Sequence, residues 1–168
     1  MNPPQVLIIM GSDSDLLVMG EAARVLTEFD FPFEMRISSA HRSPRRTGLL
    51  ASEAEDRGVK VVIAGAGMAA HLAVVVAAET TLPVIGVPIG GGALNGIDAL
   101  YSTVQMPGGI PVATMAIGKA GAKNAAILAV QILALADGGL AAKLKSYRAR
   151  MSQEVEEKDQ KLTAGNAG

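Results

Sequence analysis

Short runs of β-branched and aliphatic residues alternate along this chain with longer segments of helical periodicity, and this alternation restricts the possible folds most strongly. The apolar runs are almost continuous and each ends at a Gly, Ser or Pro cluster, which is typical of strands buried on both faces. We predict strands at Val6–Met10, Phe33–Ser38, Val59–Ala64, Val84–Val87 and Val112–Ile117. The sequence therefore predicts a doubly wound parallel sheet, a flavodoxin-like three-layer α/β/α fold.

Helices are predicted between these strands. The first follows a cap at Ser14 or Asp15, and the second starts with Ser43 as its cap and Pro44 at its first position and ends at Gly58. Further helices are predicted at about 70–80, 97–104 and 120–136, and a C-terminal helix at about 140–162. We expect one domain over residues 1–163, including the C-terminal helix, and a disordered tail at 164–168.

Composition excludes several classes of function. The 168 residues carry a formal net charge of -1, which provides no field to attract nucleic acid or an anionic membrane. Cysteine is absent, so disulfides and thiolate chemistry are excluded. The N-terminus lacks the basic start and apolar core of a signal peptide, and the longest apolar stretch, 125–136, is too short to span a bilayer. We therefore expect a cytoplasmic protein with a small-molecule ligand.

The first candidate site is the run Gly11-Ser-Asp-Ser-Asp15, directly after the first strand. Backbone amides at a helix N-terminus can bind a phosphate, and the hydroxyls of Ser12 and Ser14 could add donors. The carboxylate of Asp15 is suited to accepting hydrogen bonds from sugar hydroxyls, so the run suggests a sugar phosphate. The alternative is that these residues only cap a helix, because Ser and Asp are preferred capping residues.

The second candidate site is the run Ser39-Ala-His-Arg-Ser-Pro44. Pro44 restricts the loop, so His41 and Arg42 are presented from a stiff turn. The planar guanidinium of Arg42 suits phosphate or carboxylate, and His41 can transfer a proton near neutral pH. The alternative role for His41 is local capping or packing.

The third candidate site is Gly65-Ala-Gly-Met-Ala-Ala-His71, after the third strand. Its glycines match the spacing of dinucleotide sites, but no acidic residue ends the next strand, so a dinucleotide is not favoured. The glycines suit close approach of backbone amides to a small anionic group. His71 either faces the cleft or caps a helix. Two histidines without cysteine match no recognised metal-ligand spacing, so no metal is expected.

The last informative segment runs from Asn95 to Thr114 and mixes an amphipathic turn with a Gly/Pro loop. Gln105-Met-Pro107 within it is a candidate lid over a ligand. The helix after Ala120 is apolar almost all round and must be buried, either in the core or between subunits. An oligomer is expected.

These motifs together resemble the class I carboxyaminoimidazole ribonucleotide mutases of purine synthesis, in order and over nearly the whole chain. The matching runs are 11–15, 39–44, 64–67, 69–72, 86–88, 96–114 and 118–124. The resemblance implies a cofactor-free isomerase that forms homo-octamers with sites between subunits. It moves a carboxylate from the exocyclic nitrogen to the adjacent ring carbon, by loss and recapture of carbon dioxide.

The resemblance also implies roles for individual residues. His41 matches the family's proton shuttle. Ser12, Asp15 and Arg42 match residues that bind the ribose phosphate, with Ser14 and Ser39 nearby, and the loop containing Gly67, Met68 and His71 matches the part of the site around the carboxylate and carbon dioxide.

The chain departs from the family at Met68, where glycine is usual, at Ala73-Val74, where Pro-Gly is usual, and at Ala99, where serine is usual. Three hypotheses follow: the mutase, a direct aminoimidazole ribonucleotide carboxylase of the related second class, and a paralogue that binds a ligand without catalysis. The chain resembles the mutases more closely than the second class in the His-Arg-Ser-Pro loop and in the loop after the third strand, which favours the mutase.

Overall fold

A computed structural model of the chain describes residues 3–165. Its centre is a five-stranded parallel sheet with the strand order β2-β1-β3-β4-β5. The strands are β1 (Val6–Met10), β2 (Phe33–Ile37), β3 (Val61–Gly67), β4 (Val84–Ile89) and β5 (Ala113–Thr114). This is the strand order of the flavodoxin-like class, so the predicted fold is confirmed.

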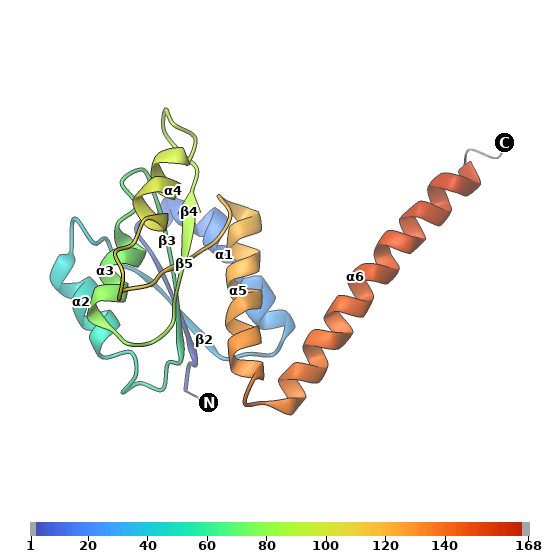
Figure 1. The fold of residues 1–168 in the computed structure, drawn as a ribbon, viewed down its shortest axis with the longest axis horizontal. Helices are drawn as coiled ribbons and strands as arrows, with labels where there is room; N and C mark the ends of the chain where they lie inside the picture. The colour runs from blue at the N-terminus through green and yellow to red at the C-terminus, as the bar shows by residue number, and fades with distance from the viewer. Residues whose placement is uncertain (1–2, 166–168) are drawn as a thin grey trace. The chain divides into compact units, whose positions relative to one another are not determined.

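Helices cover both faces of this sheet (Figure 1): α1 (Leu16–Glu28), α2 (Pro44–Ser52), α3 (Leu72–Glu79), α4 (Ile97–Val104) and α5 (Lys119–Ala134). A short 3-10 turn η1 (Asp13–Asp15) precedes α1, and a last helix, α6 (Gly138–Gly165), follows α5 in the chain. Every residue of β1 and β4 is buried, as are the first five residues of β3. Burial on both faces explains their continuous apolar sequences.

One close approach aligns the first helix with the centre of the sheet. A Cβ atom at Gly65 in β3 would lie 2.2 Å from the sulfur of Met19 in α1. Met19 is itself fully buried, so glycine at position 65 provides the space in which the helix packs. This contact places the start of α1 beside the end of β3.

Two predicted strands have different bounds in the structure. The third strand begins at Val61 and continues through the glycines to Gly67, which pairs with Ile89. The predicted strand at 112–117 pairs regularly only over Ala113–Thr114. Beyond it, Met115 donates to the Gly86 carbonyl at 2.8 Å, but Pro88 has no N–H with which to continue the ladder.

The second helix is shorter than predicted. It starts at Pro44, as expected, but ends at Ser52 and is followed by turns up to Gly58. Gly58 has φ of +91°, and its N–H donates to the Glu55 carbonyl at 2.9 Å. This glycine therefore ends the series of turns and not the helix itself.

The chain divides into two compact units, with the division between Ala129 and Val130. The second contains the end of α5 and α6, and α6 is mostly exposed along its length. Helix α6 includes residues 164 and 165 of the predicted tail, and residues 166–168 lie outside the described residues. A single domain over 1–163 stays a prediction.

Within residues 3–165, no helix is long and apolar enough to cross a membrane.

Two helical glycines provide a matched test of this packing. A Cβ at Gly20 in α1 would meet no atom within 4 Å, whereas one at Gly121 in α5 would lie 1.7 Å from the Ala116 carbonyl oxygen. Gly20→Ala should stabilise the protein by about 0.5–1 kcal/mol through helix propensity. Gly121→Ala should destabilise it by about 1–3 kcal/mol because backbone must move. Denaturant unfolding measures both, and effects of the same sign would contradict the packing.

Candidate functional site

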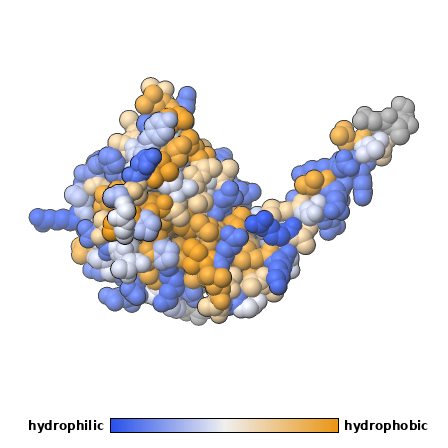
Figure 2. All heavy atoms as spheres, viewed as in Figure 1, coloured by the Kyte–Doolittle hydropathy of each residue, from blue (hydrophilic) through white to orange (hydrophobic). Residues whose placement is uncertain are grey.

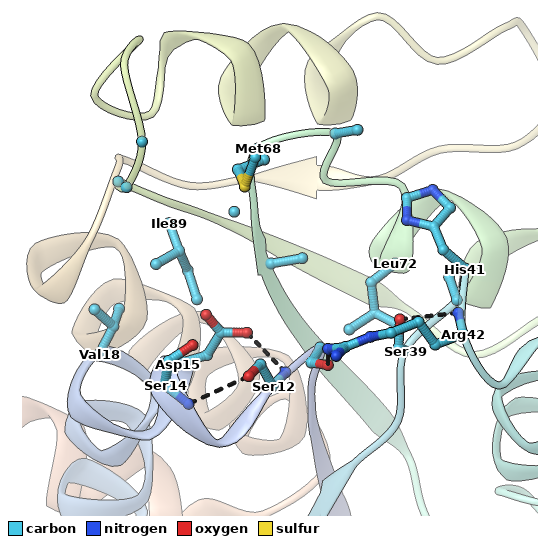
Figure 3. Close-up of a pocket in the computed structure, with 18 of the residues that line it drawn as sticks. Ser12, Ser14, Asp15, Val18, Ser39, His41, Arg42, Met68, Leu72 and Ile89 are labelled. Atoms are coloured by element: carbon cyan, nitrogen blue, oxygen red, sulfur yellow. Dashed lines mark hydrogen bonds between the residues drawn. The ribbon is translucent and has the colours of Figure 1, made fainter.

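The carboxyl ends of the first four strands border one cavity of about 680 Å³ (Figure 3). In parallel sheets this edge is where small-molecule sites form, and the volume is typical of such sites. Of the candidate residues identified in the sequence, eight line the cavity: Ser12, Ser14, Asp15, Ser39, His41, Arg42, Gly67 and Met68. The other candidate, His71, is not a lining residue, but it contacts one.

The loop after β1 is organised by its own polar side chains. Ser12 occupies the N-cap of η1, where its hydroxyl accepts from the Ser14 N–H at 3.4 Å and donates to the Asp13 carboxylate at 2.9 Å. In return, the Asp15 carboxylate accepts from the Ser12 N–H at 3.0 Å. The run therefore caps the 3-10 turn η1, and this capped turn is part of the cavity wall. Asp15 occupies the predicted N-cap position of α1 but makes no side-chain capping bond there.

The two carboxylates of this turn have opposite electrostatic environments. Burial raises the pKa of Asp15, although hydrogen bonds from the Ser12 and Gly11 amides oppose the shift. The hydrogen bond from the Ser12 hydroxyl lowers the pKa of exposed Asp13, with further lowering from the Ser14 amide. Asp15 is thus the partly buried acceptor at the cavity, and Asp13 supports the turn from the solvent side.

The loop between β2 and α2 is joined to the end of β1. Arg42 donates through Nη2 to the Gly11 carbonyl at 3.3 Å, and its backbone N–H donates to Ser39 Oγ at 3.1 Å. Ser43 is at the N-cap position of α2 but makes no capping hydrogen bond. Its hydroxyl instead donates to the Ser39 carbonyl at 3.0 Å and accepts from the Ser39 N–H at 3.1 Å. These bonds set the orientation of the segment that carries His41.

The two histidines of the chain lie in direct contact. His41 Nε2 and His71 Nδ1 are 3.1 Å apart, and the rings meet edge to face with centroids 5.2 Å apart. His71 occupies the N-cap position of α3 without a side-chain capping bond. A hydrogen bond between two ring nitrogens needs one donor and one acceptor, so the facing nitrogens share a single proton. Nε2 of His41 is therefore engaged by His71 in either tautomer, and Nδ1 is the ring nitrogen of His41 that this contact leaves free.

The loop after β3 is kept open on the cavity side by glycine. A Cβ at Gly67 would lie 3.1 Å from the Ile89 carbonyl oxygen, so glycine permits the close pairing of β3 with β4 at the cavity edge. Met68 follows with φ of +55°, is 63% exposed to solvent and lines the cavity. The other departures, Ala73, Val74 and Ala99, do not line the cavity; Ala73 and Ala99 are buried.

Sequence reasoning missed two parts of this region. The run Gly90-Gly-Gly92 after β4 also lines the cavity, and three consecutive glycines at a strand end are a signal of close approach. An adjoining cavity of about 640 Å³ shares Ser12, Ser39 and Arg42 with the first and adds Arg46. The spacing of four residues from Arg42 to Arg46, across the start of a helix, is the signal for this second arginine.

Two further expectations concern the surroundings of the cavity. The expected lid Gln105-Met-Pro107 does not line the cavity in the described part of the chain, and Met106 packs against the hydrophobic core. Within residues 3–165, no three His, Asp or Glu side chains gather as a metal-binding group.

The fold and the cavity together define a small-molecule-binding protein of the doubly wound α/β class. A family model described as AIR carboxylase matches residues 5–154, and the chain belongs to this family. It is 57% identical over 159 residues to the N5-carboxyaminoimidazole ribonucleotide mutase of Pyrococcus horikoshii, covering 95% of this chain and 89% of that protein.

Two other relatives extend the comparison. The chain is 53% identical over 159 residues to the phosphoribosylaminoimidazole carboxylase of Saccharomyces cerevisiae, covering 95% of this chain but 28% of that longer protein. The crystal structure of Treponema denticola PurE matches with a TM-score of 0.84 at 34% identity, over 95% of this chain and 98% of that one.

The pKa shifts predict opposite pH dependences for two conservative variants. Because burial raises the pKa of Asp15, its ionised form destabilises the folded state, and this penalty disappears as the pH falls through that pKa. Asp15→Asn should therefore unfold with a free energy at least equal to the unmodified chain at neutral pH, with the advantage vanishing in acid.

Asp13→Asn is the control for this experiment. The lowered pKa of Asp13 means that its ionised form contributes stability above its unfolded pKa and loses it in acid. The variant should therefore be less stable at neutral pH and equal at low pH. Urea unfolding at several pH values measures both variants, and the same pH trend in both would contradict the assignment.

Proposed function

We propose that this protein isomerises carboxyaminoimidazole ribonucleotide to 5-amino-4-carboxyimidazole ribonucleotide in purine synthesis. The observation that carries the proposal is 57% identity to a named mutase over 95% of the chain. The cavity supports it, because a histidine, an arginine and a capped Ser-Asp turn line one space of nucleotide size. Met68 lies across the cavity from Asp15 (Figure 3), and Gly67 also lines the cavity.

The polar side of the cavity suits the ribose phosphate. The Ser14 hydroxyl and the guanidinium of Arg42 supply donors for phosphate, and Ser39 lies beside Arg42. The Ser12 hydroxyl, which donates to Asp13 in this structure, joins them when it turns toward the ligand. Asp15 is an acceptor for a ribose hydroxyl, since its partly buried carboxylate carries no basic salt-bridge partner within 4 Å in the described residues. The aminoimidazole ring would then extend toward the end of β3, where Gly67 and Met68 lie.

The reaction needs one proton to be donated to the exocyclic nitrogen and one proton to be removed from the ring carbon. When the bond between the exocyclic nitrogen and the carboxyl carbon breaks, its electron pair stays on nitrogen, which gains a proton as carbon dioxide leaves. The ring carbon then forms a bond to carbon dioxide and loses its own proton. His41 serves as donor and then acceptor, so the cycle closes without a metal or redox cofactor.

The contact with His71 supports this role for His41. Because the facing nitrogens share one proton, His71 can hold the His41 ring in a single orientation and tautomer. We therefore assign His71 a positioning role through His41, in addition to shaping the region around the carboxylate. This assignment joins the second and third candidate sites, the runs 39–44 and 65–71, into one functional unit.

The proposal extends to a cytoplasmic homo-octamer. Ile97, Tyr101 and Val104 form an exposed apolar row along α4, and Leu94 in the turn before the helix is also exposed. Apolar residues are visible in this region in Figure 2. Such a row on a folded unit supports burial against other subunits. The number eight rests on the family resemblance, and light scattering of the purified protein measures it.

A phosphorylated substrate cannot diffuse across membranes, which supports the cytoplasmic location.

A direct carboxylase was the alternative to the mutase, and the comparisons do not favour it, because the 53% identity to the yeast carboxylase covers only 28% of that longer protein. The decisive assay supplies carboxyaminoimidazole ribonucleotide in one reaction and aminoimidazole ribonucleotide with bicarbonate in another, and follows the carbon-carboxylated product. Efficient conversion of the first substrate supports the mutase, and preferential use of the second supports the carboxylase. Ligand-dependent melting without turnover would identify a binding protein.

His41→Asn should reduce turnover by at least about 10³-fold, because asparagine cannot accept and return a proton. Melting temperature and assembly should stay near those of the unmodified protein, because His41 is exposed. Initial rates with carboxyaminoimidazole ribonucleotide measure the effect. Retained activity would rule out the proton-transfer role.

Arg46 is proposed as a second cation for the phosphate, with its neighbour Arg45 as the matched control. Both arginines are exposed, but only Arg46 lines the cavity that shares Ser12 and Arg42. Arg46→Ala should raise KM about tenfold with little change in kcat, as loss of one charged contact predicts. Arg45→Ala should change neither constant. Equal effects of the two substitutions would indicate a general charge effect instead.

A further inference from the structure

Met68 has an unusual backbone conformation for its residue type. Among residues 3–165, three non-glycine residues have positive φ: Asp30, Asn95 and Met68. Asp and Asn tolerate this left-handed region because their short side chains form local hydrogen bonds, whereas an unbranched apolar residue gains no such compensation. Strained residues of this kind persist where the surrounding structure holds them, and they gather at ligand sites.

The chain on both sides of Met68 is fixed. Gly67 before it pairs with Ile89 in the sheet, and after it the Ala70 N–H donates to the Met68 carbonyl at 2.8 Å. Helix α3 begins at Leu72. The backbone therefore has little freedom to carry the side chain elsewhere, and the thioether is directed to the cavity, across from Ser12 and Asp15 (Figure 3).

The wall beside Met68 has no side chains of its own. Gly90, Gly91 and Gly92 line the cavity here, and a Cβ at Gly92 would lie 3.9 Å from Met68 Cγ. A Cβ at Gly91 would meet no atom within 4 Å. The triple glycine thus leaves space for a long, flexible side chain to change rotamer at the cavity mouth. Met68 itself is 63% exposed, so most of its surface is not covered by packing.

We propose that the Met68 side chain covers the reacting end of the bound ribonucleotide and keeps released carbon dioxide in the cavity. This role rests on the proposed mutase reaction. Carbon dioxide is small and neutral, so no charged group can retain it, and escape competes with its capture by the ring carbon. An apolar side chain over the mouth reduces escape and excludes water. Met68 is then a residue that determines how faithfully the carboxylate is transferred.

Three substitutions at position 68 distinguish the effect of the side chain from the effect of the backbone strain. Met68→Ala removes the thioether chain but keeps a residue that disfavours positive φ. Met68→Gly removes both the side chain and the strain, and Met68→Leu keeps an apolar side chain of similar volume. Met68→Gly should melt at a higher temperature than Met68→Ala. Equal melting temperatures would contradict a strained backbone at position 68.

The experiment uses carboxyaminoimidazole ribonucleotide with an isotopically labelled carboxylate, in buffer containing unlabelled bicarbonate. Label retained in the carbon-carboxylated product is compared with total substrate consumed. The unmodified protein and Met68→Leu should retain most of the label, whereas Met68→Ala and Met68→Gly should both lose label on the order of fivefold more often.

The outcomes distinguish this proposal from the proposed function. If the unmodified protein forms no carbon-carboxylated product, the mutase reaction itself is wrong; product that carries no label would instead overturn the retention of carbon dioxide. If it forms product and both small variants retain label equally well, the covering role of Met68 is wrong while the mutase stands. Loss of label in Met68→Gly but not in Met68→Ala would assign the effect to the backbone and would also overturn the proposal.

Discussion

The parallel pairing of β1 between β2 and β3 is the constraint on which the site depends. Met10 at the end of β1 is level with Ile37 on one side and Gly65 on the other. Two hydrogen bonds continue the alignment into the loops: Ser38 N–H donates to the Met10 carbonyl at 2.9 Å, and Gly11 N–H donates to the Gly65 carbonyl at 3.2 Å. Three loops distant in sequence therefore emerge side by side.

Polar groups in these loops have structural and functional uses at the same time. Ser12 caps a turn and lines the cavity, and Arg42 donates to the Gly11 carbonyl while its guanidinium also borders two cavities. This dual use preorganises the donors before a ligand arrives, which reduces the entropy lost on binding. Capping and ligand binding were alternatives for these residues in the sequence analysis, but one residue can have both roles.

The apolar side of the cavity provides a different kind of control. Leu72, Ile89 and Met68 line it, and the glycines after β3 and β4 keep bulky neighbours away. A site that handles a charged sugar phosphate and a neutral gas needs both surfaces, because charge orients the nucleotide but does not retain carbon dioxide. The polar turn around Asp15 serves to orient the nucleotide, and the proposed role of Met68 is to retain carbon dioxide.

The sequence by itself determined the fold class and most of the cavity-lining candidates. Alternation of apolar strands with capped helices leaves few architectures, and polar residues at strand ends must meet at one edge of a parallel sheet. Strand ends were less predictable: the glycines of β3 looked like a loop, yet they pair with β4, because pairing depends on the neighbouring strand.

Only the tertiary structure decided which side chains meet. His41 and His71 are separated by 30 residues in the chain, and nothing local to either one shows that their ring nitrogens lie 3.1 Å apart. Arg46 lines an adjoining cavity, the expected lid at 105–107 does not line the main cavity, and Met68 has a left-handed backbone and lines the cavity. Local sequence specifies periodicity and capping, whereas contacts across loops depend on strand register and packing.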